Sequence, residues 1–169
     1  MKYLIVLLCF LPLTVCADNW SFPAEVTREV TRFGEVRLIL IMNSLKNQVY
    51  PDYELLIENK DMIITNLVNV GYQDVFASPE NRYFLGVSNI GIPDTAYIIF
   101  DAGGNVIKHI KHHVSGLAYS KQTVTLIREW YDKKNPNVVF TITKGQLIAI
   151  HINNSSGERI ELLSLPTIP

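Results

Sequence analysis

Cysteine is almost missing from this chain of 169 residues, because the sequence has only Cys9 and Cys16, both near its N-terminus. Without a thiol, the rest of the chain has no disulfide, no cysteine nucleophile and no cysteine metal ligand. A small exported domain without disulfides depends on its hydrophobic core alone. Because roughly 150 residues suffice for one such core and leave little for a second, we expect a single domain over residues 18–169.

Long apolar runs are also scarce. One begins after Lys2 and covers residues 3–15, interrupted by a proline and a threonine. It is shorter than the roughly 20 apolar residues that a membrane-spanning helix needs, and no later segment reaches that length. We therefore expect no transmembrane segment once this N-terminal run has been removed.

The same N-terminal run has the organisation of a secretory signal peptide. A charged start and a short apolar core precede the small-residue pattern Val15-Cys16-Ala17. We expect residues 1–17 to be cleaved off, the mature protein to begin at Asp18, and its location to be periplasmic or secreted. A lipoprotein acylated at Cys16 is the alternative, although the residue before a lipidated cysteine is normally smaller than Val15.

An excess of positive charge is missing as well. Once Lys2 has been removed, 14 basic residues remain against 16 acidic ones, a formal charge of −2. Nucleic-acid binding requires clustered lysine and arginine, so we expect no nucleic-acid partner. Glycine and proline are sparse and polar repeats are lacking, which argues against disorder.

Helical periodicity is also lacking, whereas segments that alternate between apolar and polar residues recur along the chain. We count about eleven or twelve strands, so the fold class is all-β. Their spacing is typical of a sandwich, a barrel or an incomplete propeller-like stack of small antiparallel sheets. The expected strands cover residues 25–33, 35–43, 53–58, 62–68, 82–89, 95–101, 106–114, 123–131, 138–143, 146–152 and 159–165.

Residues 76–110 have the order of strands and turns found in one blade of a β-propeller. Their segment Ser78-Pro79-Glu80-Asn81-Arg82-Tyr83 resembles the S-P-D-G-[KR]-Y strand starts of WD-repeat-like and periplasmic propeller proteins, with Asn81 where glycine is usual. A closed propeller needs at least about four blades, and this chain has strands for two or three. The resemblance therefore implies a local hairpin and not a complete propeller.

A wider resemblance covers most of the mature sequence. It is carried by the strings FGEVRL, YPDYEL, SPENRYFLGVSN, VTLIREWYD and RIELL. Together they resemble a set of small exported bacterial proteins to which no activity is assigned. This resemblance implies a β fold and a place in the bacterial envelope, but no catalytic residue.

The string SGLAY, Ser115 to Tyr119, is the first candidate binding element. It resembles the S-G-x-Y loop with which periplasmic lysozyme inhibitors enter the lysozyme cleft, although Tyr119 lies one residue further along. The resemblance implies that Ser115 and Tyr119 bind a partner and that residues 111–121 form an exposed, protruding loop. The alternative is a turn whose tyrosine packs at the edge of the core.

Trp130 and Tyr131 form a second candidate, because they lie beside a charged loop. Aromatic pairs next to charged residues are common in binding hot spots. Strand alternation, however, points one of the two rings inward. Core packing is therefore the favoured interpretation, with partner binding as the alternative.

Histidines supply the candidate metal ligands, at His109, His112, His113 and His151. A continuous strand would place His109 and His113 on one face but about 13 Å apart, too far to share one metal ion. We therefore expect a partly solvated polar strand and no metal site. A site would require His151 close to one of these two histidines.

Hydrolase motifs are lacking: the sequence has no G-x-S-x-G, no H-E-x-x-H and no phosphate-binding glycine loop. We expect no cofactor and a non-enzymatic protein that binds a macromolecule in the envelope, with an inhibitor of, or immunity protein against, a cell-wall hydrolase as its sharpest form. A hydrolase or metal-binding module acting on envelope polymers is the alternative. A hydrolase would need two carboxylates, or a histidine and a carboxylate, at one substrate position, with Asp74, Glu80 and Asp94 as loop candidates.

Overall fold

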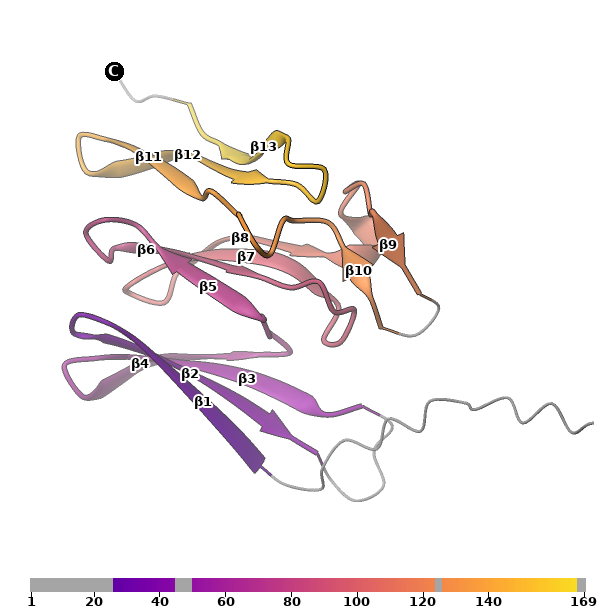
Figure 1. Ribbon diagram of the computed structural model, residues 1–169. Helices are drawn as coiled ribbons and strands as arrows, with labels where there is room; N and C mark the ends of the chain where they lie inside the picture. Colours follow the sequence, from indigo (N-terminus) through magenta and orange to yellow (C-terminus); the bar gives the residue numbers. More distant parts are fainter. Residues whose placement is uncertain (1–25, 45–49, 124–125, 167–169) are drawn as a thin grey trace, which may run out of the picture.

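The computed structural model describes residues 26–44, 50–123 and 126–166. Cys9, Cys16 and the expected cleavage site lie outside these residues. Within them, thirteen strands form four small antiparallel sheets, each open at both edges (Figure 1). No helix in this part of the chain is long and apolar enough to cross a bilayer. The all-β expectation is confirmed, and the stack of small sheets is the architecture formed.

Three sheets lie as layers in Figure 1, and in each the strand order follows the sequence. The N-terminal sheet contains β1 (Val26–Phe33), β2 (Val36–Asn43), β3 (Asp52–Asn59) and β4 (Met62–Val68). The central sheet contains β5 (Asp74–Ala77), β6 (Tyr83–Val87), β7 (Thr95–Asp101) and β8 (Val106–Lys111). The C-terminal sheet contains β11 (Val139–Thr143), β12 (Gln146–Asn153) and β13 (Arg159–Ser164). A ribbon of two short strands, β9 (Lys121–Gln122) and β10 (Arg128–Glu129), lies beside the stack.

Short turns that tolerate a left-handed backbone connect the strands. Between β3 and β4, Lys60 and Asp61 have φ angles of 51° and 61°, the paired positive values typical of a tight hairpin turn. In the turn between β5 and β6, Asn81 has a φ of 53°, so it adopts the conformation for which glycine is usual. The hydroxyl of Ser78 accepts hydrogen bonds from two backbone N–H groups after this turn, which fixes the start of β6.

Buried side chains cover both faces of the central sheet. Six consecutive residues of β7 are buried, as happens when a strand is packed on both sides. One core lies against the N-terminal sheet and contains Phe84, Ile98 and Phe100 together with Leu38, Leu55 and Ile57. The other core lies against the C-terminal sheet and contains Leu85, Val87, Tyr97 and Ile99 together with Trp130, Ile150 and Ile152.

Two expected strands are shorter than the alternation predicted. Of residues 123–131, only Arg128–Glu129 is paired in a sheet, and residues 124–125 lie outside the described part of the chain. The hydroxyl of Thr123 accepts hydrogen bonds from the backbone N–H groups of Leu126 and Ile127, and such local bonds compete with strand pairing.

The expected strand over residues 106–114 ends early in the same way. β8 ends at Lys111, and a single 3₁₀ turn, η1 (His112–Val114), follows it. The backbone N–H and the hydroxyl of Ser115 both donate to the carbonyl of His112, which closes the turn. His109 and His113 therefore do not lie on one straight strand, so the separation of about 13 Å expected for a strand does not apply.

Burial of the central sheet predicts that substitutions inside it cost more stability than substitutions at its exposed positions. Val87 on β6 is fully buried, whereas Val106 on β8 in the same sheet is 44% exposed. Val87→Ala removes buried methyl groups and leaves a cavity, so we expect it to lower the free energy of unfolding by roughly 1.5–3 kcal/mol. Val106→Ala is the matched control and should cost less than about 0.5 kcal/mol in urea denaturation. Equal losses in the two variants would contradict the layered core.

Candidate functional site

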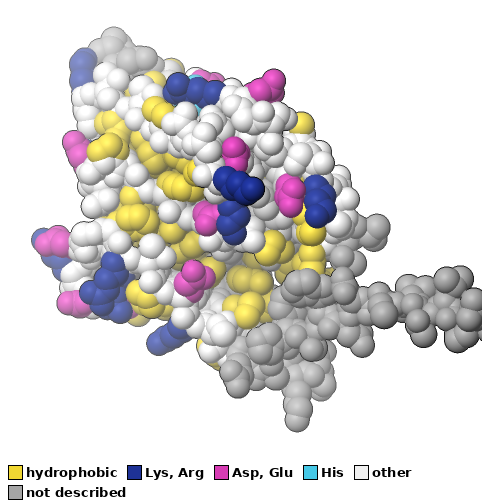
Figure 2. Space-filling model, viewed as in Figure 1, with side chains coloured by type: hydrophobic (Ala, Val, Ile, Leu, Met, Phe, Trp, Pro, Cys, Tyr) yellow, Lys and Arg dark blue, Asp and Glu magenta, His cyan; other side chains and the backbone are white. Residues whose placement is uncertain are grey.

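Three surface hollows meet around the connection between β6 and β7, residues 88–94. The first, about 360 Å³ in volume, lies between the N-terminal and central sheets and is lined by Tyr53, Tyr72 and Ile92. The second, about 470 Å³, shares Gln73, Ile90 and Lys133 with the first. The third is smaller, about 180 Å³. Hydrophobic side chains reach the surface among charged ones on the face shown in Figure 2.

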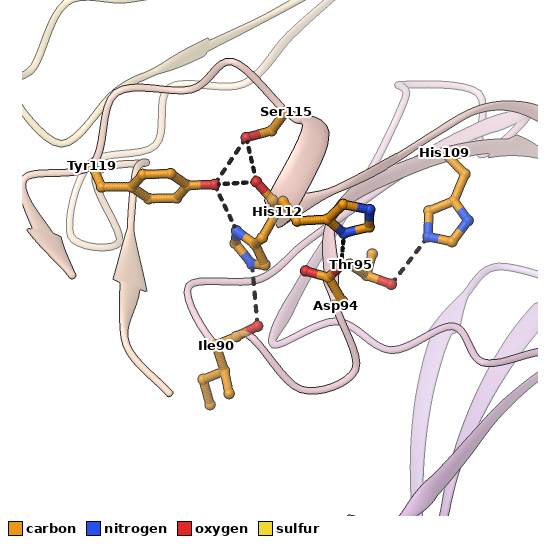
Figure 3. A network of polar contacts seen from close by, with 8 residues as sticks. Ile90, Asp94, Thr95, His109, His112, Ser115 and Tyr119 are labelled. Atoms are coloured by element: carbon orange, nitrogen blue, oxygen red, sulfur yellow. Dashed lines mark hydrogen bonds and ion pairs between the residues drawn. The ribbon is translucent and has the colours of Figure 1, made fainter. Parts of the chain in front are cut away.

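The third hollow contains a cluster of polar side chains (Figure 3). His112 is buried, and its Nε2 lies 3.2 Å from the carbonyl oxygen of Ile90. Its Nδ1 lies 3.2 Å from the hydroxyl of Tyr119. Because a carbonyl only accepts hydrogen bonds, the neutral ring carries its proton on Nε2. Nδ1 is then an acceptor that faces the Tyr119 hydroxyl, whose one proton is shared with the carbonyl of His112.

Ser115 and Tyr119, both predicted as binding residues, are brought together by this cluster. Their hydroxyl oxygens are 2.8 Å apart, and they lie 3.0 Å and 2.9 Å from the carbonyl oxygen of His112. Both hydroxyls are therefore engaged inside their own loop. They fix the loop's shape, so its other side chains are the ones that face solvent.

Residues 111–121 form a surface loop around this cluster. Seven of its eleven residues are exposed, and Val114 is 65% exposed. The exposed residues are Lys111, His113, Val114, Gly116, Ala118, Ser120 and Lys121. The loop thus combines an apolar side chain with cationic ones on a backbone that is held from within.

Burial changes the titration of two histidines near the third hollow. Desolvation lowers the pKa of His112, against a smaller opposing effect of Asp94. Burial likewise lowers the pKa of His109, whose Nε2 lies 3.1 Å from the hydroxyl of Thr95. Both rings are therefore held in the neutral form at pH values where exposed histidines begin to bind protons.

A histidine and a carboxylate meet at the rim of the third hollow. His113 Nδ1 contacts a carboxylate oxygen of Asp94, and Arg128 also lines this hollow. A nucleophilic serine would need a hydrogen bond to an imidazole nitrogen. Among the described contacts, the Ser115 hydroxyl is bonded to Tyr119 and to backbone groups instead.

Trp130 and Tyr131, the other two predicted binding residues, both lie in the core. Trp130 Nε1 donates to the carbonyl of Ser88 at 2.8 Å, and the Tyr131 hydroxyl donates to the carboxylate of Asp74. Burial, and secondarily Asp74, raises the pKa of Tyr131. Core packing, the favoured interpretation, is confirmed for both rings, so neither is displayed on the surface. The expectation from strand alternation that only one ring points inward is wrong, because both residues follow the end of β10. Trp130 instead holds one end of the connection around which the hollows lie.

Tyr72, which lines the first hollow, was not singled out by its sequence. Its ring is buried, and its hydroxyl has no hydrogen-bond partner among the described residues. Desolvation and the nearby carboxylate of Glu29 raise its pKa. The sequence carries no signal for this arrangement, because Glu29 lies on β1 and Tyr72 in the connection between β4 and β5, and the two meet only in the folded protein.

His151 lies on β12 in the C-terminal sheet, with its Nε2 3.6 Å from a carboxylate oxygen of Glu161 on β13. In the described part of the chain, no group of three or more histidine, cysteine, aspartate or glutamate side chains is placed to hold a metal ion. The histidines near the third hollow are instead engaged with Ile90, Thr95, Asp94 and Tyr119.

Comparisons with protein-family models, with curated proteins and with solved structures found no match to this chain. Its function must therefore be inferred from its own residues.

Burial of His112 predicts that the stability of the fold depends on pH. Unfolded His112 binds a proton near pH 6.5, whereas the folded ring binds it only at lower pH. The unfolded state therefore gains protons first, and stability falls as the pH drops below about 6.5. We expect His112→Gln to lose less stability than the wild type between pH 7.5 and 5.5 in urea denaturation at both pH values.

His113→Gln is the control for this measurement, because the side chain at the neighbouring position is exposed. It should not reduce the loss of stability at low pH. If His112→Gln loses as much stability at low pH as the wild type does, His112 is not held neutral by the fold.

Proposed function

We propose that this chain is an exported, non-enzymatic protein that binds another protein in or beyond the bacterial envelope. The observation that carries the proposal is the loop of residues 111–121, which exposes most of its side chains while Ser115 and Tyr119 fix its backbone from within. A loop that is already ordered loses little conformational freedom on binding, which favours affinity. The location rests on the N-terminal segment, which resembles a signal peptide.

The chemistry of the loop supports a particular kind of partner. Val114 supplies an exposed apolar side chain, and Lys111 and Lys121 supply positive charge at the two ends of the loop. Glycoside hydrolases carry a pair of carboxylates in their substrate cleft. A cationic loop with an apolar tip complements such a cleft, so inhibition of a cell-wall hydrolase, as by an inhibitor or an immunity protein, is the sharpest form of the proposal.

The hollows beside the loop extend the surface that a partner can contact. Tyr119 lines the third hollow, and Ser120 lines the second. Both hollows border the connection between β6 and β7, which Trp130 fixes through its bond to Ser88. A partner seated on the loop therefore has concave surface next to it, into which its own side chains can pack if the two shapes are complementary.

A hydrolase acting on envelope polymers is the second candidate, and the pair of His113 and Asp94 favours it. A histidine beside a carboxylate is the usual pairing for general acid–base catalysis, and this pair lines a hollow. We rank this candidate second because both side chains are substantially exposed and the hollow is small.

Affinity capture with the mature protein as bait, from envelope and secreted fractions, tests the first candidate. Retained proteins are identified by mass spectrometry, purified and titrated against the bait. We expect a cell-wall hydrolase whose activity falls when the bait is added. Val114→Asp should weaken binding at least about tenfold, because it places a charge where an apolar side chain is buried in the complex.

Val106→Asp is the matched control, since it introduces the same charge at another exposed valine, on β8. It should leave the affinity unchanged. Equal affinity for both variants would show that the loop is not the binding element. Turnover of peptidoglycan by the purified protein alone, lost in Asp94→Asn, would instead establish the hydrolase.

A further inference from the structure

The N-terminal sheet leaves its outer face, the side turned away from the central sheet, without a covering layer among the described residues (Figure 1). Leu38, Leu55 and Ile57 point into the core between the two sheets. Because side chains alternate along a strand, their neighbours in sequence point outward. Six of the ten large hydrophobic side chains exposed in the described residues lie on the two edge strands of this sheet: Val26, Val30, Met62, Ile63, Ile64 and Val68.

An apolar row crosses the middle of the outer face. The strand register places Val30 on β1 beside Ile39 on β2, and Ile39 beside Leu56 on β3. Exposed apolar residues concentrated on one face of a small protein are typical of an interaction surface. Within the row Val30 is 47% exposed, whereas Ile39 is only 5% exposed, so the exposed apolar area lies mainly toward the edge strands. The charged residues on either side of the row decide what packs there.

Charges on the outer face are separated by strand. Arg28 and Arg32 on β1 and Arg37 on β2 make one half of the face positive. Glu54 and Glu58 on β3 make the other half negative. The strand register places these glutamates in the same rows as the arginines. Within this face Arg37 already pairs with Glu58 at 2.9 Å, whereas Arg28 and Arg32 have no ion pair among the described residues.

We propose that the outer face packs against the same face of a second copy of this chain, forming a twofold symmetric dimer. A twofold axis that runs along β2, parallel to the strands, places β1 of each copy over β3 of the other. Arg28 and Arg32 then lie over the partner's Glu54 and the partner's Glu58, and Val30 lies over the partner's Leu56. Positive and negative strands meet twice, as an interface between identical surfaces requires.

The proposed packing repeats the arrangement inside each copy, where sheets of similar size stack face to face. Sheets packed in this way lie about 10 Å apart with their strands nearly aligned. Loop 111–121 follows β8 in the central sheet and is not part of the outer face. A dimer built on the N-terminal sheet therefore presents two copies of the loop, and its existence does not depend on what the loop binds.

Sedimentation equilibrium of the mature protein tests this proposal, over concentrations from about 1 to about 100 µM because association follows mass action. We expect a monomer–dimer equilibrium in the wild type. The double variant Arg28→Glu with Arg32→Glu should associate at least about tenfold more weakly, since its face carries mainly negative charge. Adding Glu54→Arg and Glu58→Arg to that double variant exchanges the charges of β1 and β3, so opposite charges face each other again and the dimer should be restored.

Lys133→Glu with Lys134→Glu is the matched control, because it reverses two positive charges at the second hollow and not on the outer face. This variant should dimerise like the wild type. A wild type that remains monomeric at every concentration overturns the proposal. So does a dimer that the double arginine variant leaves intact while circular dichroism shows that variant to be folded.

Discussion

Burial of the central sheet on both of its faces is the constraint on which the rest of the structure depends. Phe84 and Phe100 stack with their ring centroids 5.3 Å apart on one side, and Leu85 and Ile99 pack on the other. A sheet with two apolar faces needs a cover on each, which the N-terminal and C-terminal sheets supply. Because the three hollows meet at a connection between two strands of this sheet, the geometry of the candidate site depends on the same packing.

Strands and turns were predictable from sequence because they depend on neighbouring residues. The strand expected over residues 146–152, which forms as β12, and the local hairpin expected within residues 76–110, with its turn at Asn81, are examples. The order of the layers was not predictable, because β7 is apolar on both sides and its sequence does not say which sheet covers which face. The early end of β8 was missed because hydrogen bonds of Ser115 to His112, which alternation does not reveal, close the turn there.

The candidate site was only partly predictable for a related reason. Ser115 and Tyr119 were named from a short resemblance, but the partner that gives them a structural role, His112, was considered only as a possible metal ligand. The contacts of His112 with Ile90 and of His113 with Asp94 join residues 22 and 19 positions apart. Such contacts follow from the packing of the connection after β6, so they come from the fold and not from any local pattern.

Hydrogen exchange of the backbone amides, followed by mass spectrometry, tests most directly whether the doubly buried central sheet supports the whole molecule. Amides of β6 and β7 have ladder partners on both sides and apolar side chains on both faces, so they should exchange most slowly of all. Amides of the edge strand β1 should exchange sooner, when the N-terminal sheet opens. Slowest exchange in the N-terminal or C-terminal sheet, with β6 and β7 less protected, would contradict this account.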